Sequence, residues 1–172
     1  MIQVTLESLM EVRVDGVVRP IRSDLTPVNT VSRDLGVAAG EGVAERLAKV
    51  GPLPLGGAVV TPGGELPAHF MIHVVVMSED EPQTEASVQR ALQNGLRRAS
   101  DFGMESLAVP ALGMGVGLTE PEVSARALVD ILFHHIDEGR QPLALTISVS
   151  SPYEASLFER LVEEFGHERA GH

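Results

Sequence analysis

The stretch Ser106-Leu107-Ala108-Val109-Pro110-Ala111-Leu112-Gly113-Met114-Gly115-Val116-Gly117-Leu118 joins a short apolar run to a loop with glycine at every second position. The apolar run is typical of a buried strand. Glycine lacks a Cβ and adopts positive φ freely, so the N–H groups of such a loop can turn toward an anion. Thr119-Glu120-Pro121-Glu122 then resembles a helix start, with a threonine cap and an early proline. The stretch predicts an anion-binding loop between a strand and a helix; a tight turn whose glycines only ease packing is the alternative.

Strands and helices alternate on both sides of this stretch. Hydrophobic periodicity and turn residues predict strands at 2–6, 12–18, 57–61, 70–76 and 143–149, and helices at 42–50, 84–102, 121–137 and 152–165. This order indicates an α/β fold with a central mixed sheet covered by helices on both faces. In such sheets ligands bind beyond the carboxyl ends of the strands, where the loop Gly113–Gly117 falls.

The length and composition are those of one soluble domain. A chain of 172 residues can bury a sizeable core, and we expect a single domain over 1–165 with a frayed tail over 166–172. Cysteine is absent, so disulfides, thiol nucleophiles and thiolate metal sites are excluded. The N-terminus lacks a basic leader, and no apolar run approaches the roughly 20 residues of a membrane span. The expected location is the cytoplasm.

The charge balance argues against nucleic acid as a partner. The formal net charge is −11, Lys49 is the sole lysine, and Trp is absent, so neither a basic surface nor a stacking platform is expected. A small anionic ligand held by backbone amides remains compatible with this charge. Adjacent helical residues point about 100° apart, so His134 and His135 do not predict a metal site. His73 ends an apolar run and is expected to be a core histidine.

Two separated motifs resemble the macro domain family. The first is Gly56-Gly57-Ala58-Val59-Val60-Thr61-Pro62-Gly63-Gly64-Glu65-Leu66-Pro67-Ala68-His69-Phe70-Met71-Ile72-His73, and the second is the stretch Ser106–Gly117. The resemblance implies a three-layer α/β/α sandwich whose cleft binds ADP-ribose or a related nucleotide, with the loop around the diphosphate. It implies no required cofactor other than this ligand, and an ADP-ribosylated protein as a further partner.

Other parts of the family's site differ here. The family's V-N-A-A-N segment, whose asparagine contacts the distal ribose, is matched by Val18-Arg19-Pro20-Ile21-Arg22. Its G-G-G-V-D segment is matched by Gly40, Gly42 and Val43, with Ala44 at the aspartate position. The resemblance therefore implies ligand contacts from these residues: Glu7, Val18, Arg19, Arg22, Gly40, Gly42, Val43, Ala111, Leu112, Gly113, Met114, Gly115, Val116, Gly117 and Tyr153.

These differences leave several functions open. Arg19 and Arg22 could grip an anion, or they could form salt bridges with Glu41 or Glu45 and fill the vacated pocket. The leading hypothesis is a domain that binds ADP-ribose without the family's hydrolase activity. One alternative is an ADP-ribosyl or O-acetyl-ADP-ribose hydrolase with a replacement base from 23–39, such as Asp24 or Asp34. Another is an interaction protein that kept the fold and lost the pocket.

Overall fold

The computed structural model describes residues 1–113 and 120–171, which form a six-stranded sheet and five helices. The strands are β1 (Ile2–Thr5), β2 (Gly16–Arg22), β3 (Ala58–Pro62), β4 (Phe70–Met77), β5 (Ser106–Pro110) and β6 (Ala144–Ser148). The helices are α1 (Thr30–Ala39), α2 (Glu41–Val50), α3 (Glu85–Asp101), α4 (Pro121–Asp137) and α5 (Pro152–Ala170). The strand order is β1-β6-β5-β2-β4-β3, and every neighbouring pair is parallel except β3 and β4.

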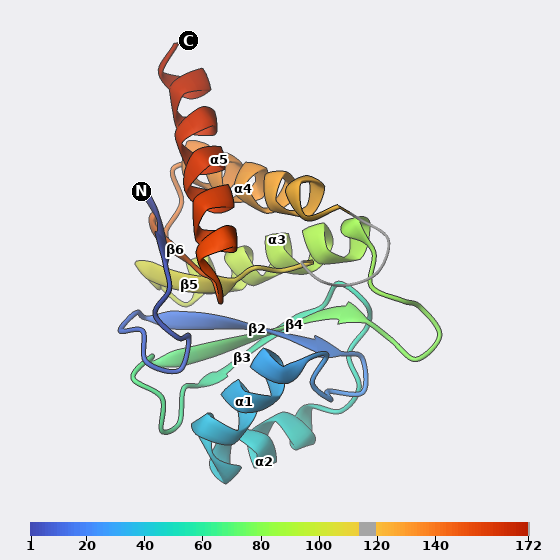
Figure 1. Cartoon of the computed structure of the whole chain (residues 1–172). Helices are drawn as coiled ribbons and strands as arrows, with labels where there is room; N and C mark the ends of the chain where they lie inside the picture. Colours follow the sequence, from blue (N-terminus) through green and yellow to red (C-terminus); the bar gives the residue numbers. More distant parts are fainter. Residues whose placement is uncertain (114–119, 172) are drawn as a thin grey trace.

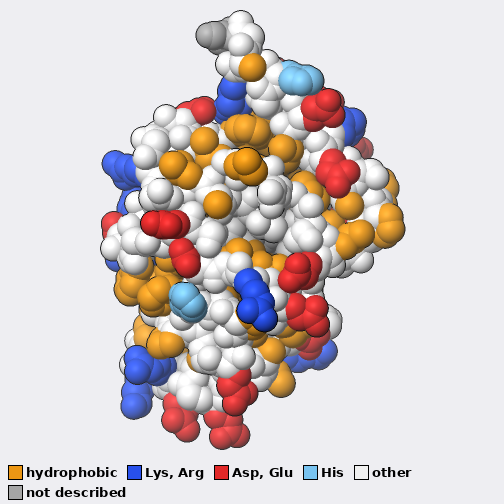
Figure 2. All heavy atoms as spheres, turned by 90° about the vertical axis from the view of Figure 1, so that its left-hand side faces the viewer, with side chains coloured by type: hydrophobic (Ala, Val, Ile, Leu, Met, Phe, Trp, Pro, Cys, Tyr) orange, Lys and Arg blue, Asp and Glu red, His pale blue; other side chains and the backbone are white. Residues whose placement is uncertain are grey.

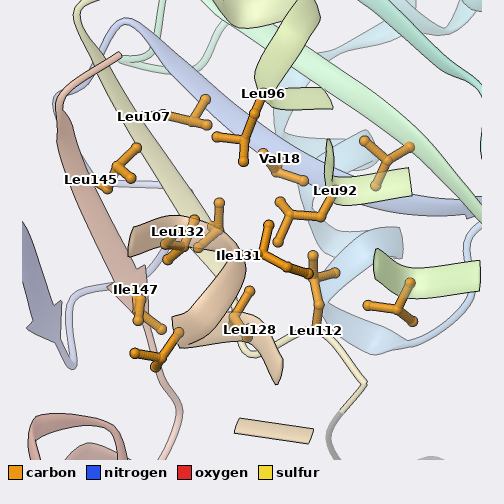
Figure 3. Packing of buried hydrophobic residues seen from close by; sticks show 14 of the residues in the cluster. Val18, Leu92, Leu96, Leu107, Leu112, Leu128, Ile131, Leu132, Leu145 and Ile147 are labelled. Carbon is orange, nitrogen blue, oxygen red and sulfur yellow. The ribbon is translucent and has the colours of Figure 1, made fainter. Parts of the chain in front are cut away.

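The helices cover both faces of this sheet, so the predicted three-layer α/β/α fold is confirmed. Figure 1 shows α3, α4 and α5 on one side and α1 and α2 on the other. The larger core cluster lies between the sheet and α3 to α5, where Val18, Leu92, Leu107, Leu132 and Ile147 converge (Figure 3). A smaller cluster under α1 and α2 contains Val17, Leu35, Val43 and Met71. Because side chains alternate along a strand, β2 supplies both clusters: Val18 enters one and Val17 the other.

Helix α3 shows how the sequence pattern produces this packing. Its apolar residues recur at helical spacing, and those on one face are buried: Val88, Ala91, Leu92, Leu96 and Ala99. Thr84 caps the helix in a reciprocal capping box with Ser87. The helix therefore begins and ends within a residue or two of the predicted bounds.

Three elements differ from their prediction. Helix α1 was not predicted, and it lies within residues 23–39, for which the sequence predicts neither a helix nor a strand. Strand β2 begins at Gly16 rather than at residue 12, because the preceding residues form a turn in which Val12 N–H donates to the Ser8 carbonyl at 3.1 Å. Helix α5 continues to Ala170, so residues 166–170 are not a frayed tail. Arg169 holds this last turn through a 2.8 Å hydrogen bond to Asp137.

The surface carries both signs of charge. On the face that Figure 2 shows, Lys and Arg side chains are interspersed with Asp and Glu rather than gathered into one basic area. No helix in the described part of the chain is both long enough and apolar enough to cross a bilayer.

Candidate functional site

A cavity of about 300 Å³, called the cleft below, lies at the carboxyl ends of the central strands. Its walls come from the segments at and after the ends of β1, β2, β4, β5 and β6, together with one side of α1 and the start of α5. The lining residues are Leu6, Ser8, Leu9, Met10, Pro20, Asn29, Val31, Asp34, Leu35, Gln83, Pro110, Ala111, Leu112, Gly113, Ser148, Val149, Ser150 and Glu154. This is the edge of the sheet where a ligand was expected from the order of the elements.

The end of β5 forms the middle wall of the cleft. Leu112 N–H donates to the Pro110 carbonyl at 2.8 Å and closes a tight turn, while the Leu112 side chain anchors the turn in the larger core cluster. Gly113 has a φ of 83°, a left-handed conformation that side-chain-bearing residues rarely adopt. Three of the predicted ligand residues, Ala111, Leu112 and Gly113, therefore line the cleft. Four further predicted residues of the same loop, Met114, Gly115, Val116 and Gly117, lie outside the described residues.

One side of α1 forms the facing wall and was missed from the sequence. Asn29 caps the helix by accepting a hydrogen bond from Ser32 N–H at 2.9 Å, so the positive end of the α1 dipole borders the cleft. Val31, Asp34 and Leu35 share one helical face and line the cleft behind that cap. The available signal was the Asn29 cap followed by apolar residues at helical spacing.

The far end of the cleft is built by the segments after β1 and β6. Ser148 Oγ donates to the Glu7 carbonyl at 2.7 Å and ties these two segments together. The Glu154 carboxylate accepts from Ser150 N–H at 3.0 Å and from Ser150 Oγ at 2.8 Å. Glu7 itself is not among the lining residues, and Tyr153 is 65% exposed and also outside them. Their neighbours Ser8 and Glu154 line the cleft instead.

Arg19 is almost completely buried, with 6% of its surface exposed, and it points to the α1 face of the sheet. Its Nε donates to the Ser32 carbonyl of α1 at 2.7 Å, and its Nη1 donates to His73 Nδ1 at 3.4 Å. Because arginine cannot accept, His73 Nδ1 is the acceptor and His73 Nε2–H donates to Thr61 Oγ1 at 2.9 Å. Burial, and after it the charge of Arg19, lowers the pKa of His73 to about 3. His73 is therefore a neutral core residue, as expected.

Arg19 opens into a second hollow, called the Arg19 groove below, and not into the cleft. This groove has a volume of about 860 Å³. It is lined by Arg19, Asp24, Leu25, Pro27, Arg33, Gly36, Val37, Gly40, Glu41, Val43, Ala44, Leu47, Ala48, Gly51 and Pro52. The predicted site residues thus divide into two groups. Ala111, Leu112 and Gly113 border the cleft, whereas Arg19, Gly40 and Val43 border the Arg19 groove.

The remaining predicted residues lie apart from both hollows. Val18 is fully buried in the larger core cluster, and Gly42 is a residue of α2 with open space around it. Arg22 Nη1 donates to the Pro27 carbonyl at 2.7 Å. The expected salt bridges of the two arginines to Glu41 or Glu45 are absent from the described residues, since no carboxylate there lies within 4.0 Å of Arg19 or Arg22. That interpretation was wrong, because Arg19 donates to the Ser32 carbonyl and His73 Nδ1 and Arg22 donates to the Pro27 carbonyl.

The candidate replacement bases are also separated. Asp34 lines the cleft with its side chain 44% exposed, and Arg33 Nε lies 3.7 Å from Asp34 Oδ1. Asp24 lines the Arg19 groove, and hydrogen bonds from Thr26 lower the pKa of its carboxyl. Within residues 1–113 and 120–171 no group of three or more His, Asp and Glu side chains is placed to hold a metal ion.

Comparison with known proteins identifies similar sequences and folds. A sequence profile of the Macro domain family matches residues 18–128. The chain is 37% identical over 126 residues to an uncharacterized protein of Aeropyrum pernix, a match that covers 72% of this chain and 67% of that protein. It is 32% identical over 120 residues to an Enterobacter cloacae protein named O-acetyl-ADP-ribose deacetylase, covering 69% and 67% of the two chains. A variant of the Oceanobacillus iheyensis macrodomain, solved with ADPR, has the same fold, with a TM-score of 0.80 and 17% sequence identity. The match covers 95% of this chain and 92% of that one.

Proposed function

The chain belongs to the macro domain family, and from this premise we propose that its cleft binds ADP-ribose or a related nucleoside diphosphate. We further propose that it does so without the hydrolase activity of catalytic relatives. The observation that carries the binding proposal is the meeting of two features in one cavity. The glycine-bearing end of β5 and the N-terminus of α1 both line the cleft.

The chemistry of the cleft suits a nucleotide held mainly by backbone groups. None of the described lining residues is lysine or arginine, so the positive end of α1 and the amides near Gly113 would have to meet the diphosphate. The far end offers apolar side chains for a nucleobase, including Leu6, Leu9 and Val149. The volume of the whole cleft, about 300 Å³, falls at the lower end of the range for small-molecule sites.

The proposed lack of ordinary hydrolase activity rests on three positions. Arg19, Arg22 and Ala44 stand where the family motif has two amides and a carboxylate. A guanidinium stays protonated and cannot take a proton from water, and a methyl group can orient nothing. Moreover, Arg19 opens on the groove side of α1, away from the cleft. Since misplacement of reacting groups alone can cost about 100-fold in rate, these changes support binding over turnover.

Binding is tested by calorimetry and thermal unfolding with ADP-ribose. At about 100 times the Kd, a ligand adds about 2.7 kcal/mol to the free energy of unfolding, which should raise the Tm by about 5–10 °C. Ala111→Glu places a bulky anion in the half-buried middle wall and should abolish this rise. Ala170→Glu is the matched control, because it makes the same change at an exposed residue near the end of α5.

The outcome separates binding from loss of the pocket. If ADP-ribose, ADP and AMP all leave the Tm of the parent protein unchanged, the binding proposal fails, and the interaction-protein alternative replaces it. If Ala111→Glu binds ADP-ribose as tightly as Ala170→Glu does, the nucleotide site lies elsewhere.

A second candidate function is favoured by the position of Asp34. It is a half-exposed carboxylate on the cleft wall, where it could take a proton from water attacking the acetyl carbonyl of O-acetyl-ADP-ribose. The ribose oxygen would leave and take up a proton, giving acetate and ADP-ribose. Release of acetate by the parent protein, lost in Asp34→Asn but kept in Asp24→Asn, would establish this activity and overturn the noncatalytic proposal.

A further inference from the structure

Arg19 is a buried cation without a counter-ion among the described residues. No Asp or Glu carboxylate in 1–113 or 120–171 lies within 4.0 Å of its guanidinium. Its neighbour His73 cannot repel or neutralise it, since that ring stays uncharged above pH 3. Burial of an unpaired charge is costly, and it also lowers the pKa of Arg19 below its ordinary value. An anion beside Arg19 would offset this cost.

The hydrogen bonds of Arg19 leave donors pointing toward the groove. A guanidinium carries five N–H groups, of which Nε serves the Ser32 carbonyl and one on Nη1 serves His73. Nη2 has no hydrogen-bond partner in the described part of the chain, yet no enclosed side-chain nitrogen there is unsatisfied. Nη2 is therefore reached by solvent, through the groove that Arg19 lines.

Gly36 makes the exposed position of Nη2 sterically possible. A Cβ on Gly36 would lie 2.5 Å from Nη2 and 3.0 Å from the guanidinium carbon of Arg19. A side chain at this position of α1 would force the guanidinium to shift from the place where its hydrogen bonds to Ser32 and His73 hold it. The arginine, the glycine and the helix thus form one fitted arrangement beneath the groove.

Helix α1 separates the Arg19 groove from the cleft. Val31, Asp34 and Leu35 line the cleft, whereas Arg33, Gly36 and Val37 line the groove. At 100° per residue these two sets lie on opposite sides of the helix. A molecule in the groove is thus on the far side of α1 from the proposed nucleotide site.

Apolar side chains make up much of the groove wall around Arg19. Leu25, Val43, Leu47 and Pro52 contribute to its walls. Its other charged residues are Asp24, Arg33 and Glu41, which sum to one negative charge. A phosphate dianion carries more negative charge than Arg19 can neutralise, and the carboxylates of Asp24 and Glu41 would repel it. A ligand with one carboxylate on an apolar body matches both the charge of Arg19 and the apolar walls.

We propose that the Arg19 groove binds small organic monocarboxylates, with the carboxylate on Arg19 Nη2 and the apolar body between α1 and α2. The probe is sodium octanoate, titrated into ¹⁵N-labelled protein and followed by NMR at the Gly36 amide and the Arg19 Nε–H. Octanamide has the same body without the charge, and octyl phosphate carries the larger charge. Since no nucleotide is needed, the result does not depend on the proposed function of the cleft.

The expected result is saturable binding of octanoate, about tenfold or more tighter than octanamide, because the amide oxygen can still accept from Nη2 but carries no negative charge to pair with the guanidinium. Arg19→Met should remove that preference. It deletes an unpaired buried charge and keeps an apolar side chain of similar length, so the fold should persist. Arg13→Met is the matched control at an exposed arginine outside both hollows, and it should bind octanoate as the parent does.

Four results would overturn the proposal. These are equal affinities for octanoate and octanamide, an unchanged preference in folded Arg19→Met, tighter binding of octyl phosphate than of octanoate, or absence of saturable binding to the parent protein. The titration is repeated with saturating ADP-ribose. If octanoate still changes the chemical shift of the Gly36 amide when ADP-ribose is bound, the groove and the cleft are separate sites. Competition between octanoate and ADP-ribose would contradict a separate site.

Discussion

Acidification from pH 7.0 to pH 4.5 should destabilise this protein mainly through His73. The ring is fully buried, accepts from Arg19 and donates to Thr61, and its pKa in the folded state is about 3. In the unfolded chain the same ring has its ordinary pKa of about 6.5. A depressed folded-state pKa means that the unfolded chain binds the proton more readily, so stability is present above pH 6.5 and is lost as the pH falls toward 3.

The size of this loss follows from the two pKa values. At pH 4.5 protonation favours the unfolded chain by about 2.7 kcal/mol, and at pH 7.0 by about 0.2 kcal/mol, so His73 accounts for about 2.5 kcal/mol of the change. That difference corresponds to a fall in Tm of about 5–10 °C for a chain of this size. Urea unfolding at the two pH values measures it as a free energy.

His73→Gln isolates the contribution of this ring from those of other groups. A glutamine amide can accept from Arg19 and donate to Thr61, but it does not titrate. His135, whose pKa is also lowered, chiefly by burial, is present in both proteins and cancels in the comparison. The variant should lose about 2.5 kcal/mol less than the parent between pH 7.0 and 4.5. Equal losses in the two proteins would refute the assignment of a neutral, buried His73.

Two further substitutions test the packing that positions the hollows. Gly36→Ala should lower the free energy of unfolding by about 1 kcal/mol, because the new Cβ displaces Arg19 and this outweighs the better helix propensity of alanine. Gly42→Ala has open space around it and should leave the free energy of unfolding unchanged or slightly higher. Urea unfolding of both variants measures the difference, and stabilisation by Gly36→Ala would contradict the contact. Phe158→Ala should cost about 3–5 kcal/mol because the ring is fully buried, while Phe102→Ala, at a half-exposed ring, should cost under about 1 kcal/mol. Equal costs at the two positions would mean that Phe158 does not anchor α5.

Much of the fold could be predicted because its signals are local and repeated. Helix α4 has the predicted bounds, since Pro121 can occupy only a first turn and apolar residues then recur at helical spacing. The continuous apolar run of β4 is buried on both faces, as expected for an inner strand of a sheet covered by helices on both sides. Helix α1 lacks comparable signals. It has ten residues, an interior Gly36 and no acidic residue in its first turn, so its sequence resembles a connection.

The site was harder to predict because its residues depend on that helix. Ala111 and Gly113 border the cleft through their position after β5, which the sequence reveals directly. The direction of Arg19 is not a local property. It follows from the Ser32 carbonyl and the bare Cα of Gly36, and neither can be placed beside β2 until α1 is known to be a helix.

The arginine that stands at the first asparagine position of the family's motif is matched by features of helix α1. Under most helices an arginine at position 19 would lack both an acceptor for its Nε–H and room for its guanidinium, but here α1 supplies a carbonyl acceptor and a glycine at the point of contact. The same helix contributes Asn29 and Asp34 to the cleft on its other side. A change that removed α1 would expose Arg19 and dismantle one wall of the cleft together. Arg19, Gly36 and α1 thus form a single structural unit, and this unit lies between the two hollows.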